Sequence, residues 1–115
     1  RSFGPHGEDL VLANSVSDYD DALSRELTEK VAHANLEMRR MGFKPYVAPA
    51  FSSGALSLLS CLRGQWHYSS AFLGGVFMGG RNRLTDRGVE FERLPLPGAL
   101  ISRLKETEEK LKAIP

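Results

Sequence analysis

The sequence predicts an α+β fold in which mixed, mainly antiparallel strands pack on a long helix, a buried central helix and a C-terminal amphipathic helix. Three observations support this class. The first half holds two long stretches with apolar residues at helical spacing, and the second half holds short alternating runs separated by glycines. The final residues return to helical spacing. Strands and helices do not alternate along the chain, which argues against a parallel sheet.

The composition fits a single domain over residues 1–115. Apolar residues make up 42% of the chain, charged residues 25%, and the net charge is +1. Because no strong field of one sign exists, neither nucleic acid nor an anionic membrane is an expected partner. No apolar run approaches the roughly 20 residues that span a bilayer. The single cysteine permits no internal disulfide, so we expect a reducing, cytoplasmic location.

The first half is expected to hold one strand and two helices. Residues 10–13 are a short apolar run typical of a buried strand. Ser17 is a suitable N-cap for a helix of about 24 residues that ends at Gly42, a favourable C′ residue. Its apolar residues form one stripe, namely Leu23, Leu27, Val31, Ala34, Met38 and Met41. The next helix, from about residue 49 to 63, is apolar nearly all round and is expected to be the buried central helix.

The second half is expected to form strands and a hairpin. Residues 66–73 are rich in aromatic side chains and alternate like a strand. Residues 76–78 form a short apolar run between two glycine pairs, each of which is expected to break the sheet. Residues 83–94 read as a strand, a turn that ends in Gly88, and a second strand.

The last residues predict an amphipathic helix over residues 101–114, after two prolines that end the sheet. Its inward positions are expected to be Leu100, Leu104, Leu111 and Ile114. Glu106 and Lys110 are spaced to pair on its exposed face.

The candidate catalytic residue is His6, which lies between two glycines near the start of the chain. Imidazole has an unperturbed pKa of about 6.5, close to neutrality, so histidine is the usual proton donor and acceptor in catalysis. Gly4 and Gly7 allow unusual backbone dihedrals and close approach of a substrate, and Pro5 stiffens the bend. The plainer interpretation is a solvated histidine in a turn.

No metal site is expected. The other two histidines, His33 and His67, lie far from His6 in sequence, and no cysteine pair or His-x-x-x-His spacing is present. His33 is expected on a solvated surface, and Cys61 reads as a small core residue. No Gly-x-Gly-x-x-Gly or βαβ unit occurs, so no nucleotide-binding half is expected within these residues.

Three stretches, in this order, resemble the lactate/malate dehydrogenase family. Residues 4–11 resemble its catalytic-histidine segment Gly-x-His-Gly-Asp-Ser-Met-Val. Residues 44–50 resemble its Gly-Ser-Ala-Tyr-Tyr-Ala-Pro-Ala entry into the helix that lines the substrate pocket. Residues 88–96 resemble its Gly-Val-Glu…Leu-Pro-Leu strand before a final amphipathic helix. The chain is therefore similar to the C-terminal, substrate-side part of such an enzyme.

The resemblance implies hydride transfer between C2 of a small 2-hydroxy or 2-keto acid and NAD or NADP, with His6 moving the hydroxyl proton. It implies Gly7 and Pro45 as substrate-binding residues, and a homo-oligomer, dimer or tetramer. The cofactor would be bound mainly by the chain's own nucleotide-binding domain. The family's carboxylate-binding Arg and its Asp partner of the histidine would lie upstream of Arg1. We therefore expect the 115 residues alone to be inactive.

Two alternatives remain open at the level of sequence. The chain could be a diverged, non-catalytic module of the same fold that uses its helices for protein association. It could also be an unrelated α+β domain in which the histidine loop is coincidental. A nucleotide-binding fingerprint upstream, with an Asp and an Arg before the histidine, would favour the enzyme.

Overall fold

The computed structural model describes the backbone of residues 1–44 and 48–115, and the side chains of residues 1–44 and 51–115. It is an α+β fold with antiparallel sheets, as the sequence predicts. The elements follow one another in this order: β1 (Ser2–Phe3), β2 (Val11–Leu12), α1 (Asp21–Ala32), α2 (Ala34–Arg40), α3 (Ala48–Leu62), β3 (His67–Leu73), β4 (Val76–Thr85), β5 (Gly88–Phe91) and α4 (Gly98–Lys112).

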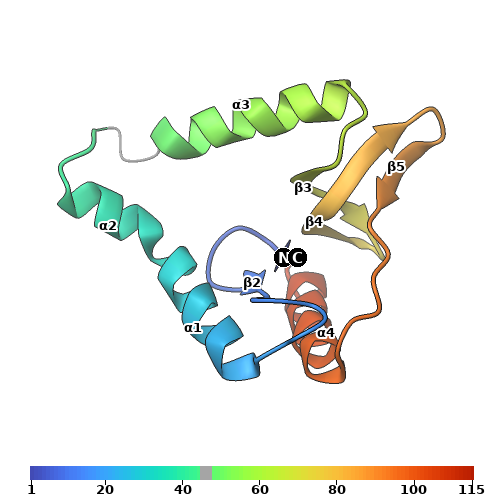
Figure 1. Cartoon of the computed structure of the whole chain (residues 1–115), viewed down its shortest axis with the longest axis horizontal. Helices are drawn as coiled ribbons and strands as arrows, with labels where there is room; N and C mark the ends of the chain where they lie inside the picture. Colours follow the sequence, from blue (N-terminus) through green and yellow to red (C-terminus); the bar gives the residue numbers. More distant parts are fainter. Residues whose placement is uncertain (45–47) are drawn as a thin grey trace.

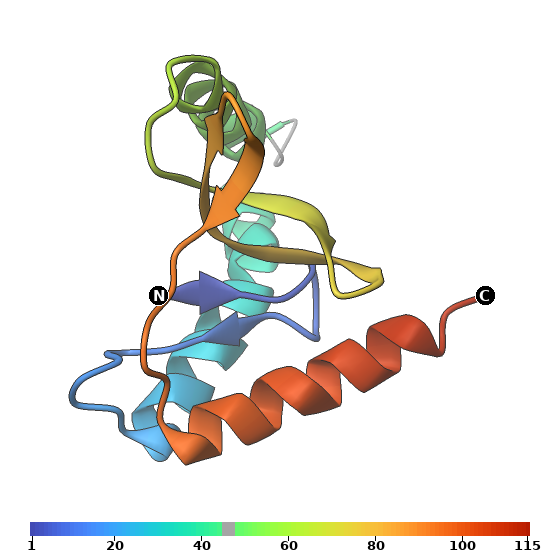
Figure 2. The ribbon, with the colours of Figure 1, turned by 90° about the vertical axis from the view of Figure 1, so that its right-hand side faces the viewer.

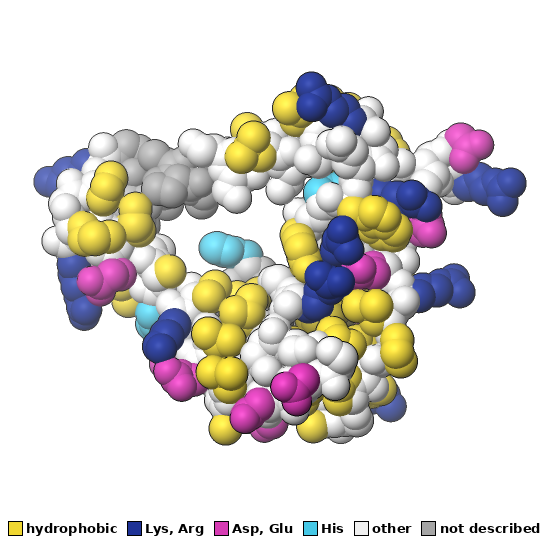
Figure 3. Space-filling model, in the orientation of Figure 1, with side chains coloured by type: hydrophobic (Ala, Val, Ile, Leu, Met, Phe, Trp, Pro, Cys, Tyr) yellow, Lys and Arg dark blue, Asp and Glu magenta, His cyan; other side chains and the backbone are white. Residues whose placement is uncertain are grey.

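The helices and the sheet surround an open centre. Helices α1, α2 and α3 run along two sides of a ring that β3–β4–β5 and α4 complete (Figure 1). The space-filling view keeps a window in the middle of the molecule (Figure 3). The radius of gyration is 15.0 Å, whereas a compact domain of this length has about 13 Å. The chain therefore leaves much of its apolar surface uncovered.

The small core lies where the first strands meet α4. Val11, Ala13 and Leu100 are buried together, and Phe3, Tyr19, Leu96 and Leu104 pack around them. In Figure 2 the β1–β2 pair lies between α4 and the larger sheet. A backbone bridge between Gly4 and Gly79 joins the two sheets. This junction fixes the loop between β1 and β2, which carries the candidate histidine.

Glycines in the sequence correctly predict several helix ends and strand ends. Gly42 and Gly64 have φ values of +87° and +66° and follow the C-terminal ends of α2 and α3. In both cases the next residue donates its N–H five residues back, as Phe43 does to Met38 and Gln65 to Ser60. The β3–β4 hairpin turns at Gly74 and Gly75, both with positive φ. The β4–β5 hairpin turns before Gly88, as predicted.

The predicted long helix is divided. α1 ends at His33, whose ring Nδ1 hydrogen-bonds the carbonyl of Glu29 at 3.0 Å. The next backbone bond, from Leu36 to the carbonyl of His33, spans three residues and tightens the turn. The N-cap is Asp20, whose carboxylate accepts from the N–H of Leu23, and not Ser17.

The faces of two helices also differ from the prediction. α1 buries Ser24, while Leu23 and Val31 of the apolar stripe stay exposed. α3 is not a buried central helix, because Phe51 and Leu62 are each 73% exposed. The main packing of α3 is against the ends of β3 and β4. Among the described residues nothing covers its outer face, so apolarity all round did not produce burial within this chain.

Two further predictions were wrong. Gly79 and Gly80 do not break the sheet, since β4 runs through them to Thr85. Gly79 is a glycine because the segment that follows β1 approaches there, and a Cβ on Gly79 would collide with the carbonyl of Gly4. In α4, Leu100 is fully buried as expected, but Ile114 lies beyond the helix end and is 66% exposed.

Candidate functional site

The His6 loop is held at its start by the larger sheet. Gly4 and Gly79 exchange both backbone hydrogen bonds, at 3.0 and 2.8 Å. Gly4 is buried with φ +89°, and a Cβ there would lie 2.9 Å from the carbonyl of Asp9. Only glycine meets both conditions at this position. The first glycine of the motif is therefore a structural anchor for the bend.

The far end of the loop is held by α4. The N–H of Leu10 donates to the carbonyl of Gly7 at 3.1 Å and closes a tight turn. Lys110 Nζ lies 3.1 Å from Asp9 Oδ1, and Thr107 Oγ1 donates to the Asp9 carbonyl at 3.4 Å. The loop is thus fixed on both sides of His6 by elements distant in sequence.

His6 lies on the bend between these anchors, with an exposed side chain. Among the described residues it makes no hydrogen bond or ion pair. Its loop lies in the space that the helices and the sheet surround (Figure 1). An imidazole held on an anchored backbone and open to solvent can exchange a proton with a ligand that reaches it.

The other two predicted site residues are less well defined. Gly7 is half-buried, has φ +106° and follows His6 directly. Pro45 lies outside the described residues, so the approach of His6 to the helix entry is not described either. A polar cavity of about 250 Å³ lies beside Asp9, Thr28 and Arg103, but His6 is not among its lining residues.

His67 has a structural environment that sequence reasoning missed. It is 7% exposed, its Nδ1 lies 3.0 Å from the carbonyl of Gln65, and its Nε2 lies 3.1 Å from Ser69 Oγ. Asn82, opposite His67 in the β3–β4 register, bonds the same serine. The signal was available, because His67 and Ser69 are two residues apart and share one face of a strand.

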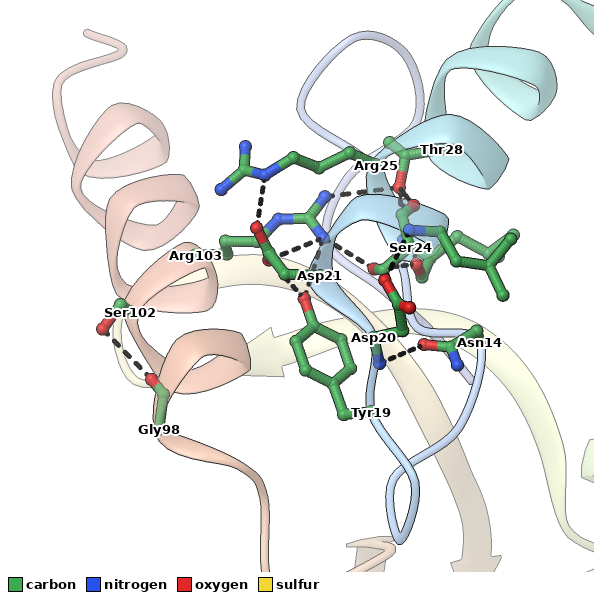
Figure 4. Close-up of polar contacts among 12 residues, drawn as sticks. Asn14, Tyr19, Asp20, Asp21, Ser24, Arg25, Thr28, Gly98, Ser102 and Arg103 are labelled. Carbon is green, nitrogen blue, oxygen red and sulfur yellow. Dashed lines mark hydrogen bonds and ion pairs between the residues drawn. The ribbon is translucent and has the colours of Figure 1, made fainter.

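A second polar cluster joins α1 to α4 (Figure 4). The Arg103 side chain is 10% exposed, and its guanidinium donates to Ser24 Oγ at 2.6 Å, Tyr19 OH at 3.1 Å and Thr28 Oγ1 at 3.3 Å. Asp21 Oδ1 lies 3.9 Å from the same group. No sequence signal pointed to Arg103, because its partners lie 75 to 84 residues earlier in the chain.

The hydroxyls of this cluster are oriented by their own hydrogen bonds. Ser24 Oγ donates to the carbonyl of Leu12, and Thr28 Oγ1 donates to that of Ser24 at 2.8 Å. Tyr19 OH donates to Asp21 at 2.8 Å. Each oxygen therefore turns a lone pair toward the arginine. We interpret the cluster as structural, because it holds α4 against α1.

The pKa of the Asp21 carboxyl is lowered, first by the hydrogen bond from Arg25 at 2.7 Å and then by that from Tyr19. The pKa of Lys110 is raised by the hydrogen bond to Asp9. Among the described residues no group of three or more His, Cys, Asp or Glu side chains could hold a metal ion. No described helix is both long and apolar enough to cross a membrane.

The fold is similar to part of a malate dehydrogenase. The structure of malate dehydrogenase from Archaeoglobus fulgidus in complex with NADH is similar to 96% of this chain, with a TM-score of 0.65 and 23% sequence identity. The match covers 40% of that protein. No family model and no curated protein sequence matches the chain. The likeness establishes a malate/lactate dehydrogenase-like fold for these residues.

Proposed function

We propose that this chain is the C-terminal, substrate-side part of a nicotinamide-dependent 2-hydroxyacid dehydrogenase of the lactate/malate type. One observation carries the proposal: a dehydrogenase-like fold over 96% of the chain coincides with a histidine on a doubly anchored loop. The dehydrogenase that it resembles was solved with NADH, which favours a nicotinamide partner here as well.

In the proposed reaction His6 handles the proton. In the oxidation of a 2-hydroxy acid, the neutral imidazole accepts the hydroxyl proton as the C–O bond becomes a carbonyl. In the reverse direction the imidazolium returns that proton to the oxygen. The anchored bend fixes the backbone on both sides of His6 and leaves the ring open to a bound ligand, as proton transfer requires. Gly7 and Pro45 would contact the substrate beside it.

The cofactor, NAD or NADP, would take up or supply the hydride at substrate C2. The described residues contain no Gly-x-Gly-x-x-Gly and no βαβ unit, so they do not themselves fit a dinucleotide. The proposal therefore assigns cofactor binding mainly to a separate nucleotide-binding domain. It also includes a homo-oligomer and a cytoplasmic location, which the lone, half-buried cysteine favours.

A second candidate function is supported by the outer face of α3. Phe51, Leu56, Leu58 and Leu62 are all more than 60% exposed, and an apolar patch of this kind marks an interaction surface. On this alternative the chain keeps the fold and serves protein association without catalysis. Such a module would give no nicotinamide-dependent turnover, whatever residue stands at position 6.

The test compares two histidine variants of the protein as its gene encodes it. We expect His6→Asn to lower the turnover of 2-keto acids by about 100-fold or more, the size of a lost acid–base group. His33→Asn removes another exposed imidazole, at the α1–α2 junction, and should leave the rate unchanged. Turnover is followed by nicotinamide absorbance with pyruvate and with oxaloacetate. Equal rates for both variants and the parent would refute the role of His6.

A further inference from the structure

A cavity that His6 does not line lies between the larger sheet and α4. Its volume is about 410 Å³, within the range of small-molecule sites. Met78 and Phe91 line it from β4 and β5, and Ile101 and Leu104 line it from α4. The lining is predominantly apolar, with charged side chains among it. The described environment thus suits a ligand with an apolar body.

The charges at this cavity are unequally neutralised. Arg81 pairs with Glu92 at 2.6 Å, and Glu108 pairs with Lys112 at 2.8 Å. Arg93 and Lys105 also line the cavity, are exposed, and have no carboxylate partner among the described residues. Both carboxylates at the cavity are therefore matched by cations, while two cations are left over. That balance selects for one anionic group on the ligand.

We propose that this cavity binds an amphipathic monocarboxylate, with its aliphatic chain among Met78, Phe91 and Ile101 and its carboxylate toward Arg93 and Lys105. A neutral apolar ligand would leave the two cations unused. A dinucleotide would place several charges and a polar sugar against an apolar lining. A cavity of this volume is large enough for a drug-sized ligand, so it suits an aliphatic tail of medium length.

The binding test uses the full chain in dilute solution. Hexanoate, octanoate and decanoate are titrated, and the methyl NMR signals of Met78 and Ile101 report occupancy. We expect the affinity to rise about two- to fourfold for each added methylene, since each buried methylene contributes up to about a fourfold gain. Decanol, which has the same chain without the charge, should bind more weakly than decanoate.

Matched charge variants separate the head group from the chain. The double variant Arg93→Gln/Lys105→Gln should weaken decanoate by about threefold to tenfold, the effect of two exposed ion pairs, and leave decanol unchanged. The control Lys30→Gln/Arg40→Gln removes the same charge from α1 and α2, away from the cavity, and should leave both ligands unchanged. Ile101→Trp, which fills the cavity, should weaken both ligands.

Several results would overturn the proposal. Equal affinity for decanol and decanoate would remove the role of the cations, as would equal losses in the test and control double variants. Ligand-induced shifts on α3, in place of Met78 and Ile101, would show that the larger exposed apolar surface is the binding site. A chain that sediments as a dimer with this cavity closed, and is not opened by decanoate, would assign it to an interface between copies.

Discussion

Replacing Arg103 should destabilise the fold more than its place on a surface helix suggests. The Arg103 side chain is 10% exposed, and the hydrogen bonds of its guanidinium to Ser24 at 2.6 Å and Tyr19 at 3.1 Å have good lengths. Hydrogen bonds to a charged group contribute about 1.5–3 kcal/mol each. The hydroxyls keep their own donor contacts, so truncation leaves no buried donor unpaired.

We therefore expect Arg103→Ala to lower the free energy of unfolding by about 3 kcal/mol, or the midpoint temperature by about 12 °C for a chain of this length. Arg103→Lys keeps the charge but cannot reach Ser24 and Thr28 together, so about half of that loss should remain. Urea unfolding followed by Trp66 fluorescence and circular dichroism measures both.

The control is Arg25→Ala. Arg25 also binds Asp21, at 2.7 Å, but its side chain is 62% exposed. An exposed pair on a helix surface is screened by solvent and contributes little to stability. If Arg103→Ala and Arg25→Ala had the same small effect, the guanidinium would not join α1 to α4, and our interpretation of the cluster would be wrong.

Two further predictions concern the junction of the sheets and the response to acid. Gly79→Ala should cost about 1–3 kcal/mol in unfolding free energy, because its Cβ would collide with the carbonyl of Gly4. Gly80→Ala meets only the ring of Phe91, at 3.8 Å, and should be tolerated; equal urea midpoints would contradict the reasoning. The folded pKa of Asp21 is lowered, chiefly by Arg25, so its contribution to stability is present above about pH 4 and is lost as the pH falls through the lower folded value. Asp21→Asn should flatten the acid side of the stability profile, and an unchanged slope below about pH 4 would exclude this contribution.

The candidate site was only partly predictable from sequence. The glycine-flanked bend around His6 could be recognised, because positive φ at Gly4 and Gly7 is a local backbone requirement. What holds the bend could not be recognised, because Gly79 and Lys110 are supplied by distant elements. The prediction that Gly79 breaks the sheet failed for the same reason. The backbone of Gly4, a segment distant in sequence, approaches Gly79 from outside its own strand.

The buried polar groups show the same limit. Ser24 and Thr28 lie outside the predicted apolar stripe, yet they form the face of α1 that packs. Arg103 and the carbonyl of Leu12 provide hydrogen-bond partners for their hydroxyls. Helix periodicity shows which side chains of one helix are apolar. It does not show which hydrogen-bond partners a neighbouring element will place against that helix. The stripe from Leu23 to Met41 is regular in sequence and mostly exposed in the fold.

The sequence by itself determined the helix ends at Gly42 and Gly64, the strand end at Gly74 and Gly75, the turn of the β4–β5 hairpin and the α+β class. These features depend on the dihedrals and side-chain spacing of neighbouring residues, which sequence states directly. Only the tertiary structure decided that α3 is exposed, that β4 is continuous, and that Arg103 joins α1 to α4. Burial and hydrogen-bond partners depend on which elements meet, and contacts across 75 or more residues leave no local pattern to read.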